Sequence, residues 1–155
     1  MRKVRIFSSV ADDAKDMQAV EIACGLSPWT LDGYESELGR EDCAAFIDRT
    51  NGREAVCFMI GRVPLISGAV AEIFNIGILP DFRRHGVGNA LLSEFLNVCR
   101  NLSVSEVWLE ARSSNQEAIV FYKANGFEPK GIRPNFYQNP AGDAQLMTLR
   151  LIQGS

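Results

Sequence analysis

Arg83-Arg84-His85-Gly86-Val87-Gly88-Asn89 is the most informative stretch of this 155-residue chain. It lies between an expected strand over residues 71–79, where apolar and polar residues partly alternate, and an expected helix over 88–102, where apolar residues recur at helical spacing. Glycines permit unusual φ values and close backbone approach, and a helix start carries partial positive charge. Backbone N–H groups of this turn can therefore converge on an anion such as a pyrophosphate.

Two well-known phosphate-binding loops do not match this stretch. The Rossmann fingerprint requires three glycines spaced G-x-G-x-x-G in a β-α-β unit, and a P-loop requires a Gly-Lys-Ser/Thr sequence that does not follow here. Glycines between a strand and a helix also often make nothing more than a tight turn. On this stretch alone, an anion site and a plain connection both stay open.

Length and composition bound the class of protein. A chain of 155 residues without a linker, repeat or low-complexity tract predicts one domain over residues 1–155. A net charge of −3 argues against a nucleic-acid partner. No apolar run approaches the roughly 18 residues that cross a bilayer, and the first residues lead into no signal-peptide core. We therefore expect a cytoplasmic protein without membrane contact.

Cysteine and histidine usage argues against a metal site. Cys24, Cys43, Cys57 and Cys99 are scattered and form no C-x-x-C pair, so we expect reduced, small core residues. His85 is the single histidine, and the cysteines lack the spacing of metal ligands. No bound metal is therefore expected.

Periodicity and turn residues predict strands and helices that alternate along the first two thirds of the chain. A strand is expected over residues 4–8, then a helix that begins at Asp12 or Asp13 and ends near Cys24. Thr30 can cap a short following helix. The pattern then predicts a helical piece over 42–49, strands over 54–60 and 63–79 joined by a hairpin turn at 61–62, and the helix over 88–102.

The last third begins with an expected strand over 106–112 that places Trp108, Glu110 and Arg112 on one face. A Ser-x-x-Glu capping box over 114–117 predicts a helix that Gly126 ends. Strands over 127–132 and 144–151 follow, separated by a loop over 133–142. This order predicts an α/β fold in which a mixed sheet carries helices on both faces.

Two blocks of the chain together resemble a known family. Arg83-x-x-Gly86-x-Gly88 after a strand resembles the acetyl-CoA pyrophosphate motif of the GNAT superfamily of N-acetyltransferases, and residues 108–115 with 118–127 resemble its second cofactor motif. The resemblance covers residues 72–149, about half of the chain. It implies a mixed, mostly antiparallel sheet of six to seven strands, about four helices, and a splayed strand pair that holds acetyl-CoA as co-substrate.

The same resemblance implies roles for particular residues. Glu110 corresponds to the general base and Tyr122 to the general acid of direct acetyl transfer through a ternary complex. Without the resemblance, Glu110 would be explained as a solvated charge on a strand face and Tyr122 as an aromatic residue of the core. The implied cofactor-binding residues are Ile76, Gly77 and Ile78 toward the acetyl and pantetheine portion, Arg84, His85, Gly86, Val87, Gly88 and Asn89 toward the pyrophosphate, and Asn115.

The resemblance also implies the acceptor, a protein N-terminal α-amine, namely the N-terminal alanine of a small-subunit ribosomal protein. An α-amino group has a pKa of roughly 7.7–8.0, against about 10.4 for lysine, so its neutral form is easier to reach. The pKa of an ordinary glutamate, about 4.3, is a poor match to either. Glu110 must therefore have a raised pKa or act through ordered water.

Several alternatives stay open at this point. The acceptor can be a small-molecule amine or a lysine side chain, and a non-catalytic module that binds acyl-CoA is a further possibility. Residues 133–138 are expected to form an acceptor-side loop, in which Phe136 and Tyr137 either clamp a peptide or cover the sheet edge. The sequence does not indicate an oligomeric state.

Overall fold

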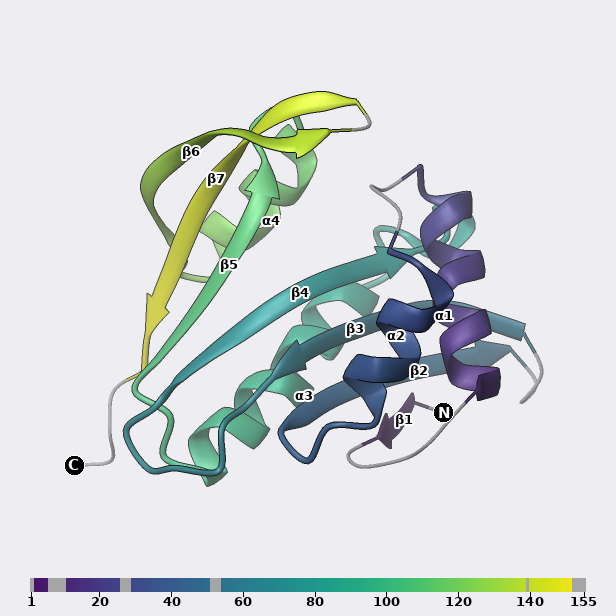
Figure 1. Ribbon diagram of the computed structural model, residues 1–155, viewed down its shortest axis with the longest axis horizontal. Helices are drawn as coiled ribbons and strands as arrows, with labels where there is room; N and C mark the ends of the chain where they lie inside the picture. The colour runs from purple at the N-terminus through teal and green to yellow at the C-terminus, as the bar shows by residue number, and fades with distance from the viewer. Residues whose placement is uncertain (1, 6–10, 26–28, 51–53, 139, 152–155) are drawn as a thin grey trace.

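Seven strands and four α-helices make up the described part of the chain (Figure 1). The computed structural model describes residues 2–5, 11–25, 29–50, 54–138 and 140–151. A 3-10 helix (Pro80–Phe82) follows the fourth strand. In chain order the elements are β1 (Arg2–Arg5), α1 (Ala11–Ala23), α2 (Leu31–Leu38), β2 (Cys43–Thr50), β3 (Glu54–Arg62), β4 (Val70–Ile78), α3 (Val87–Asn101), β5 (Glu106–Arg112), α4 (Gln116–Ala124), β6 (Glu128–Gln138) and β7 (Ala141–Arg150).

The strands form one sheet in the order β1-β2-β3-β4-β5-β7-β6. Among these strands, β4 and β5 are the single parallel pair, and all other neighbours are antiparallel. Only residues 70–73 of β4 pair with 106–109 of β5, and the two strands then diverge (Figure 1). The mixed, mostly antiparallel sheet and its splayed strand pair are thus as predicted.

A bulge in β4 lies at the point where the splay begins. The register with β3 shifts between Ile60 and Gly61, whose partners are Asn75 and Ile73, so Phe74 is the extra residue. A bulge bends its strand and increases the local twist. A Cβ on Gly61 would lie 2.6 Å from the Phe95 ring, so only glycine permits this close approach of β3 to α3.

Helices cover both faces of the sheet, as expected. In Figure 1, α1 and α2 lie on the near face of β2–β4, and α3 lies behind them. A large core packs β2–β5 and β7 against α3 and α4, with Phe95 and Met147 fully buried. A smaller core packs Met17, Tyr34 and Phe58 between α1, α2 and the opposite face. The cleft described below opens between these two layers.

Local signals explain where α2 and α4 begin and where α4 ends. The side chain of Thr30 accepts a hydrogen bond from Gly33 N and caps α2, as predicted. The cap of α4 is Asn115 rather than Ser114, because Asn115 Oδ1 accepts from Ala118 N at 3.2 Å. Gly126 ends α4 with φ +93°, a left-handed conformation that favours glycine.

Five sequence-based expectations of secondary structure need correction or a limit. Residues 42–49 form most of strand β2, not a helix, and the expected turn at 61–62 lies inside β3. The expected strand over 63–79 is observed only as Val70–Ile78, and residues 63–69 form a connection. The expected loop over 133–142 is largely the outer half of the β6–β7 hairpin, where a bulge between Arg133 and Tyr137 shifts the register. The expected first strand over 4–8 is observed as Arg2–Arg5, and residues 6–8 lie outside the described part.

Candidate active site

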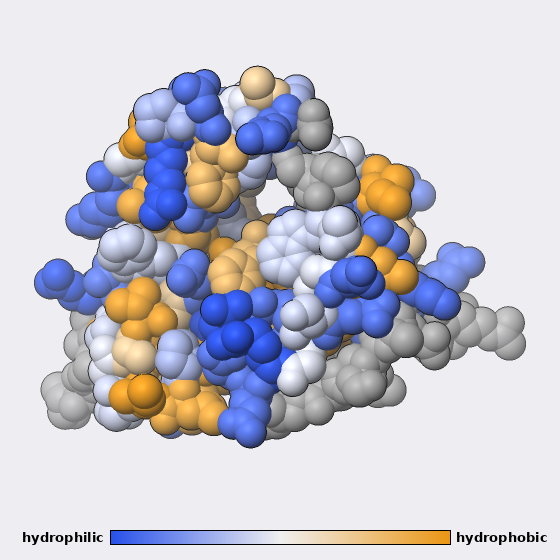
Figure 2. Space-filling view, in the orientation of Figure 1, coloured by the Kyte–Doolittle hydropathy of each residue, from blue (hydrophilic) through white to orange (hydrophobic). Residues whose placement is uncertain are grey.

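A cleft of about 940 Å³ lies where β4 and β5 diverge. Figure 2 shows the opening between the β6–β7 hairpin at the top and the α1–α2 side at the right. Six regions contribute to its walls, namely the end of α1 with Trp29, residues 73–78 of β4, the turn over 83–89, residues 109–112 of β5, the start and inner face of α4, and residues 136–138 of β6.

The predicted site residues converge on this cleft, with two exceptions. The cleft is lined by most of the glycine turn, by residues 76–78, and by Glu110, Asn115 and Tyr122. The side chain of His85 is exposed and does not line the cleft. Val87 packs against the large core instead, so the turn presents its backbone and not these two side chains to the cleft.

The glycine turn has the geometry of an anion site. Gly86 has φ +78° and precedes the first residue of α3. The first N–H groups of a helix have no intrahelical partner, so Val87, Gly88 and Asn89 can donate to a ligand. A Cβ on Gly88 would lie 3.1 Å from Phe121 and 3.3 Å from Ile78. The glycine therefore lets the helix start pack closely against both α4 and the end of β4.

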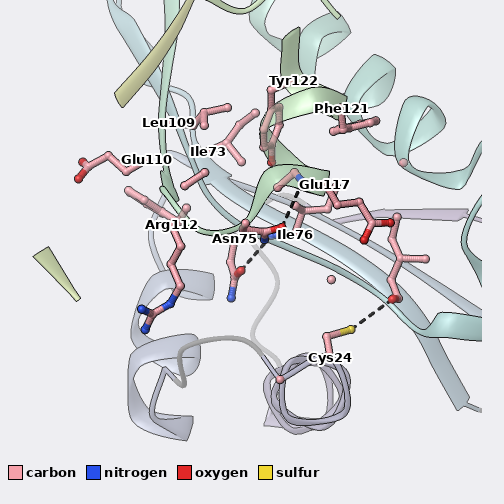
Figure 3. Close-up of a pocket in the computed structure, with 18 of the residues that line it drawn as sticks. Cys24, Ile73, Asn75, Ile76, Leu109, Glu110, Arg112, Glu117, Phe121 and Tyr122 are labelled. Carbon is pink, nitrogen blue, oxygen red and sulfur yellow. Dashed lines mark hydrogen bonds between the residues drawn. The ribbon is translucent and has the colours of Figure 1, made fainter. Parts of the chain in front are cut away.

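Arg83 and Cys24 both anchor the end of β4. Arg83 Nε donates to the Ile78 carbonyl at 2.8 Å, and Cys24 Sγ donates to the same oxygen at 3.2 Å (Figure 3). This carbonyl already accepts two hydrogen bonds, which is its full capacity. It therefore has little capacity left to accept a hydrogen bond from a ligand, which limits the main-chain contact predicted for Ile78. The sequence had assigned Cys24 only a core role.

Glu110 has a desolvated carboxylate. It lies on the β5 face opposite the core residues, and its side chain is 22% exposed. Its Oε2 atom is buried without a hydrogen bond, and Arg133 Nε lies 3.7 Å away. Burial raises the pKa of Glu110, Arg133 opposes this shift, and Glu72 adds to it. The direction matches what a base for an amine requires.

Tyr122 approaches the cleft from α4. The residue is only 4% exposed, and its ring contacts those of Phe121 and Phe127 at centroid distances of 5.2 and 5.4 Å. In Figure 3 the hydroxyl end of the ring is directed into the cleft. Burial, with a smaller contribution from Tyr137, raises the pKa of Tyr122. The phenol is therefore protonated at neutral pH and can donate a proton or a hydrogen bond.

Tyr137 and Arg112 join the site from positions that sequence reasoning did not resolve. The Tyr137 hydroxyl donates to the Glu110 carbonyl oxygen at 3.4 Å, and the Arg112 guanidinium lies over the Tyr137 ring at 4.2 Å. Arg112 Nη1 also donates to the Pro140 carbonyl at 2.9 Å. Arg112 thus ties the β6–β7 hairpin to the end of β5. Both residues line the cleft, so Tyr137 does more than cover an edge.

The described residues lack two features, a metal-binding cluster and a membrane-spanning helix. No group of three or more His, Cys, Asp or Glu side chains in this part of the chain is arranged to hold a metal ion. No helix there has the length and apolar character needed to cross a membrane. The four cysteines are free thiols, and Cys43, Cys57 and Cys99 are buried.

A sheet that splays beside a helix start with unpartnered N–H groups, with a carboxylate and a phenol in the opening, is the arrangement of an acyltransferase of the acetyl-CoA-dependent type. The chain belongs to the acetyltransferase (GNAT) family, whose model matches residues 14–127. It is 37% identical over 124 residues to the [ribosomal protein bS18]-alanine N-acetyltransferase of Escherichia coli K12, covering 79% of this chain and 80% of that protein.

Solved structures agree with this assignment. The crystal structure of the ribosomal-protein-S18-alanine N-acetyltransferase from Escherichia coli matches with a TM-score of 0.82 and 30% identity, covering 100% of this chain and 97% of that one. A GNAT family acetyltransferase from Elizabethkingia anophelis, solved with acetyl-CoA bound, matches with a TM-score of 0.74 at 17% identity, covering 97% of this chain and 98% of that chain. The second likeness shows the fold alone. The predicted family, fold and enzyme class are confirmed.

Proposed function

We propose that this enzyme moves an acetyl group from acetyl-CoA to the α-amine of a protein N-terminus, namely the N-terminal alanine of a small-subunit ribosomal protein. The relative named for that activity shares 37% of its residues across about four fifths of both chains. The observation that carries the proposal is that Glu110 and Tyr122 reach one cleft from different elements, β5 and α4. Together they provide a base for the amine and an acid for the thiolate.

Direct transfer requires a neutral amine, a site for the developing oxyanion, and a proton for the leaving sulfur. Glu110 takes the proton of the incoming ammonium. The nitrogen then attacks the thioester carbonyl, and the carbon–sulfur bond breaks as the tetrahedral intermediate collapses. Tyr122 gives its proton to the coenzyme A thiolate, and the phenolate that remains takes up the second proton that the nitrogen gives up as the amide forms. Main-chain N–H groups of the cleft-facing part of β4 are the proposed donors to the oxyanion.

The direction of the Glu110 side chain favours proton transfer through ordered water. In Figure 3 its carboxylate extends away from Tyr122, whose hydroxyl is directed into the cleft. A water chain can bridge such a separation. The raised pKa of Glu110 reduces the gap to an α-amine of pKa roughly 7.7–8.0, whereas lysine at about 10.4 would leave a larger one. This difference favours an N-terminal acceptor.

We assign the coenzyme's pyrophosphate to the turn over residues 84–89. Gly86 leaves the space beside the turn open, since a Cβ there would meet no atom within 4 Å. The carboxamide oxygen of Asn115 is used to cap α4, so any contact to the pantetheine uses its NH₂ group. Asn89 Oδ1 accepts from Asn125 Nδ2 at 3.1 Å, which holds its side chain at the rim of the cleft.

Steady-state assays with three acceptors test the proposal. We expect acetylation of a peptide with a free N-terminal alanine, none of the same peptide with a blocked N-terminus and an internal lysine, and none of free polyamines. Turnover of the polyamine or the blocked peptide alone would overturn the assignment. Mass spectrometry of cellular N-termini with and without the enzyme would then identify the acceptor protein directly.

A further inference from the structure

Glu21 is a fully buried carboxylate that takes no part in the steps above. It lies on α1 with 0% exposure, behind the part of the cleft that residues 24–25 and Trp29 line. A buried carboxylate is tolerated only when hydrogen bonds satisfy it. Glu21 Oε1 accepts from Trp29 N at 3.0 Å, Oε2 accepts from Asn75 Nδ2 at 2.8 Å, and the Tyr34 hydroxyl also bonds to it.

The three partners of Glu21 belong to three different segments of the chain. Trp29 precedes α2, Tyr34 lies within α2, and Asn75 follows the bulge residue of β4. The side chains of Trp29 and Asn75 line the cleft, and the Trp29 ring packs on Tyr34 at 5.0 Å. The Glu21 carboxylate therefore links α1 to Trp29, to α2 and to strand β4, where the splay begins.

The same network fixes the direction of the Asn75 carboxamide. Its NH₂ group donates both to Glu21 Oε2 and to the Tyr34 hydroxyl, the latter at 3.0 Å. Glu21 is an obligate acceptor when ionised, so the amide nitrogen must face it and the amide oxygen must face the other way. That oxygen accepts from Ile76 N at 3.1 Å, on the cleft side (Figure 3). Reversal of the amide would place N–H against N–H.

We propose that Glu21 is a positioning residue of acetyl transfer, which holds Trp29 in place and orients Asn75 beside the Ile76 N–H so that the acceptor amine is received in a fixed geometry. The inference rests on the proposed function, and it adds that the acceptor amine enters the cleft beside Trp29 and Asn75. Glu21 contacts neither substrate. It acts through Trp29 and Asn75.

Glu21→Gln is the first test, because the shape is kept while one acceptor becomes a donor. The glutamine oxygen can satisfy either Trp29 N or Asn75 Nδ2, and its NH₂ then faces the other N–H. A buried donor without a partner is costly, so we expect KM for the peptide to rise about ten-fold. We expect KM for acetyl-CoA to change less than about two-fold, since the glycine turn is untouched.

The reciprocal variant, Glu21→Gln with Asn75→Asp, tests the mechanism itself. The introduced glutamine can accept from Trp29 N and donate to the new carboxylate at position 75, which also accepts from Tyr34 and Ile76. We expect peptide KM to return to within about two-fold of the wild-type value. A folded double variant whose KM stays raised would overturn the proposal, and this outcome decides the matter if the single variant does not fold.

Asp13→Asn is the matched control. Asp13 is also a buried carboxylate of α1, with 3% exposure, but it pairs with Arg49 at 2.6 Å and does not line the cleft. We expect it to lower the melting temperature without altering peptide KM. An equal rise of KM in the Asp13 variant would show that Glu21 acts only through general stability, and would overturn a positioning role.

A fluorescence readout separates this inference from the proposed acceptor. If the wild-type enzyme does not acetylate the peptide, the proposed function fails while the Glu21 network remains testable. Trp108→Phe leaves Trp29 as the only tryptophan of the chain. In that background, we expect Glu21→Gln to shift the Trp29 emission maximum and the reciprocal variant to restore it. An unchanged emission after Glu21→Gln would overturn the inference.

Discussion

The pKa of the Glu110 side chain is set by two opposed influences. Burial raises it, whereas the Arg133 guanidinium, 3.7 Å from Oε2, lowers it. A base must be deprotonated to act, so activity is lost as pH falls through its pKa. The position of the acid limb of the pH–rate profile therefore depends on the burial of Glu110 and on the charges near it.

Arg133→Gln is expected to move that acid limb to higher pH. Removal of the positive charge leaves burial and Glu72 unopposed, so the pKa of Glu110 rises and the base is protonated at pH values where it was previously active. The measurement is kcat/KM for the peptide between about pH 5 and pH 10, in the range where such limbs are commonly observed. Lys130→Gln is the control, since Lys130 pairs with Glu128 at 3.5 Å on the same strand. A limb that stays in place or moves down in pH would contradict the prediction.

Glu110→Gln and Tyr122→Phe are each expected to lower kcat by about 10²–10⁴-fold, the usual contribution of a positioned acid or base. Neither side chain belongs to the glycine turn, so acetyl-CoA affinity should persist. Isothermal calorimetry of each variant with acetyl-CoA, beside steady-state kinetics, separates the two effects. If both variants kept wild-type turnover, the base and acid assignments would have to be abandoned.

Residues that stand inside a patterned motif could be predicted from the sequence, and those outside could not. Glu110 and Tyr122 fall in the block that resembles a family motif, and this resemblance, not the strand or helix pattern, assigned both of them to the site. Glu21 falls in α1, where the sequence offered only apolar spacing as a signal. Arg112 and Tyr137 meet through a hairpin whose register no local pattern specifies. Long-range pairing therefore limited the prediction of the site.

At the scale of elements, the start of α3 depends on one glycine in a left-handed conformation. Gly86→Ala would strain the turn by about 1–2 kcal/mol, because a Cβ disfavours φ +78°. We expect KM for acetyl-CoA to rise, while KM for acetyl-pantetheine, which lacks the diphosphate, stays the same. Steady-state kinetics with the two thioesters makes this comparison.

Gly68→Ala is the control for backbone strain alone. Gly68 has φ +82°, and a Cβ there would also meet no atom within 4 Å, but the residue does not line the cleft. It should lower stability to a similar extent and leave both KM values unchanged. A rise of KM for both thioesters in the Gly86 variant would mean that the turn supports the cleft in general and does not bind the diphosphate.

The elements that the sequence predicted well have one buried face and one polar face. Helix α3 and strand β5 show this pattern and were placed to within a residue or two. Strand β2 lies in the interior of the sheet, where residues 44–47 are 0% exposed, so no alternation marks it and its alanines favour a helix. Strand β6 is the opposite case, an almost wholly exposed edge strand that carries Pro129, Gly131 and Pro134. Only its pairing with β7 makes it a strand.

At the scale of the whole molecule, the cleft lies where the sheet that separates the two cores is interrupted by the divergence of β4 and β5. The large core holds α3 and α4 to one face of the sheet, the smaller core holds α1 and α2 to the other, and the β4–β5 splay opens between them. A ligand in the cleft would contact β4, the glycine turn and α4 at once. Ligand binding should therefore stabilise the native state as a whole.

We accordingly expect acetyl-CoA to raise the melting temperature. A ligand at about 100 times its Kd stabilises the native state by about 2.7 kcal/mol, which corresponds to a rise of about 5–10 °C for a domain of this size. Scanning calorimetry with and without ligand measures the rise. Gly86→Ala should show a smaller rise at the same ligand concentration, because its Kd is weaker. The Asp13→Asn variant should have a lower melting temperature than wild type, but acetyl-CoA should raise that temperature by the same amount. If the wild-type enzyme showed no rise in the presence of saturating acetyl-CoA, the glycine turn would not be a coenzyme site, and the chemistry assigned to Glu110 and Tyr122 would lose its co-substrate.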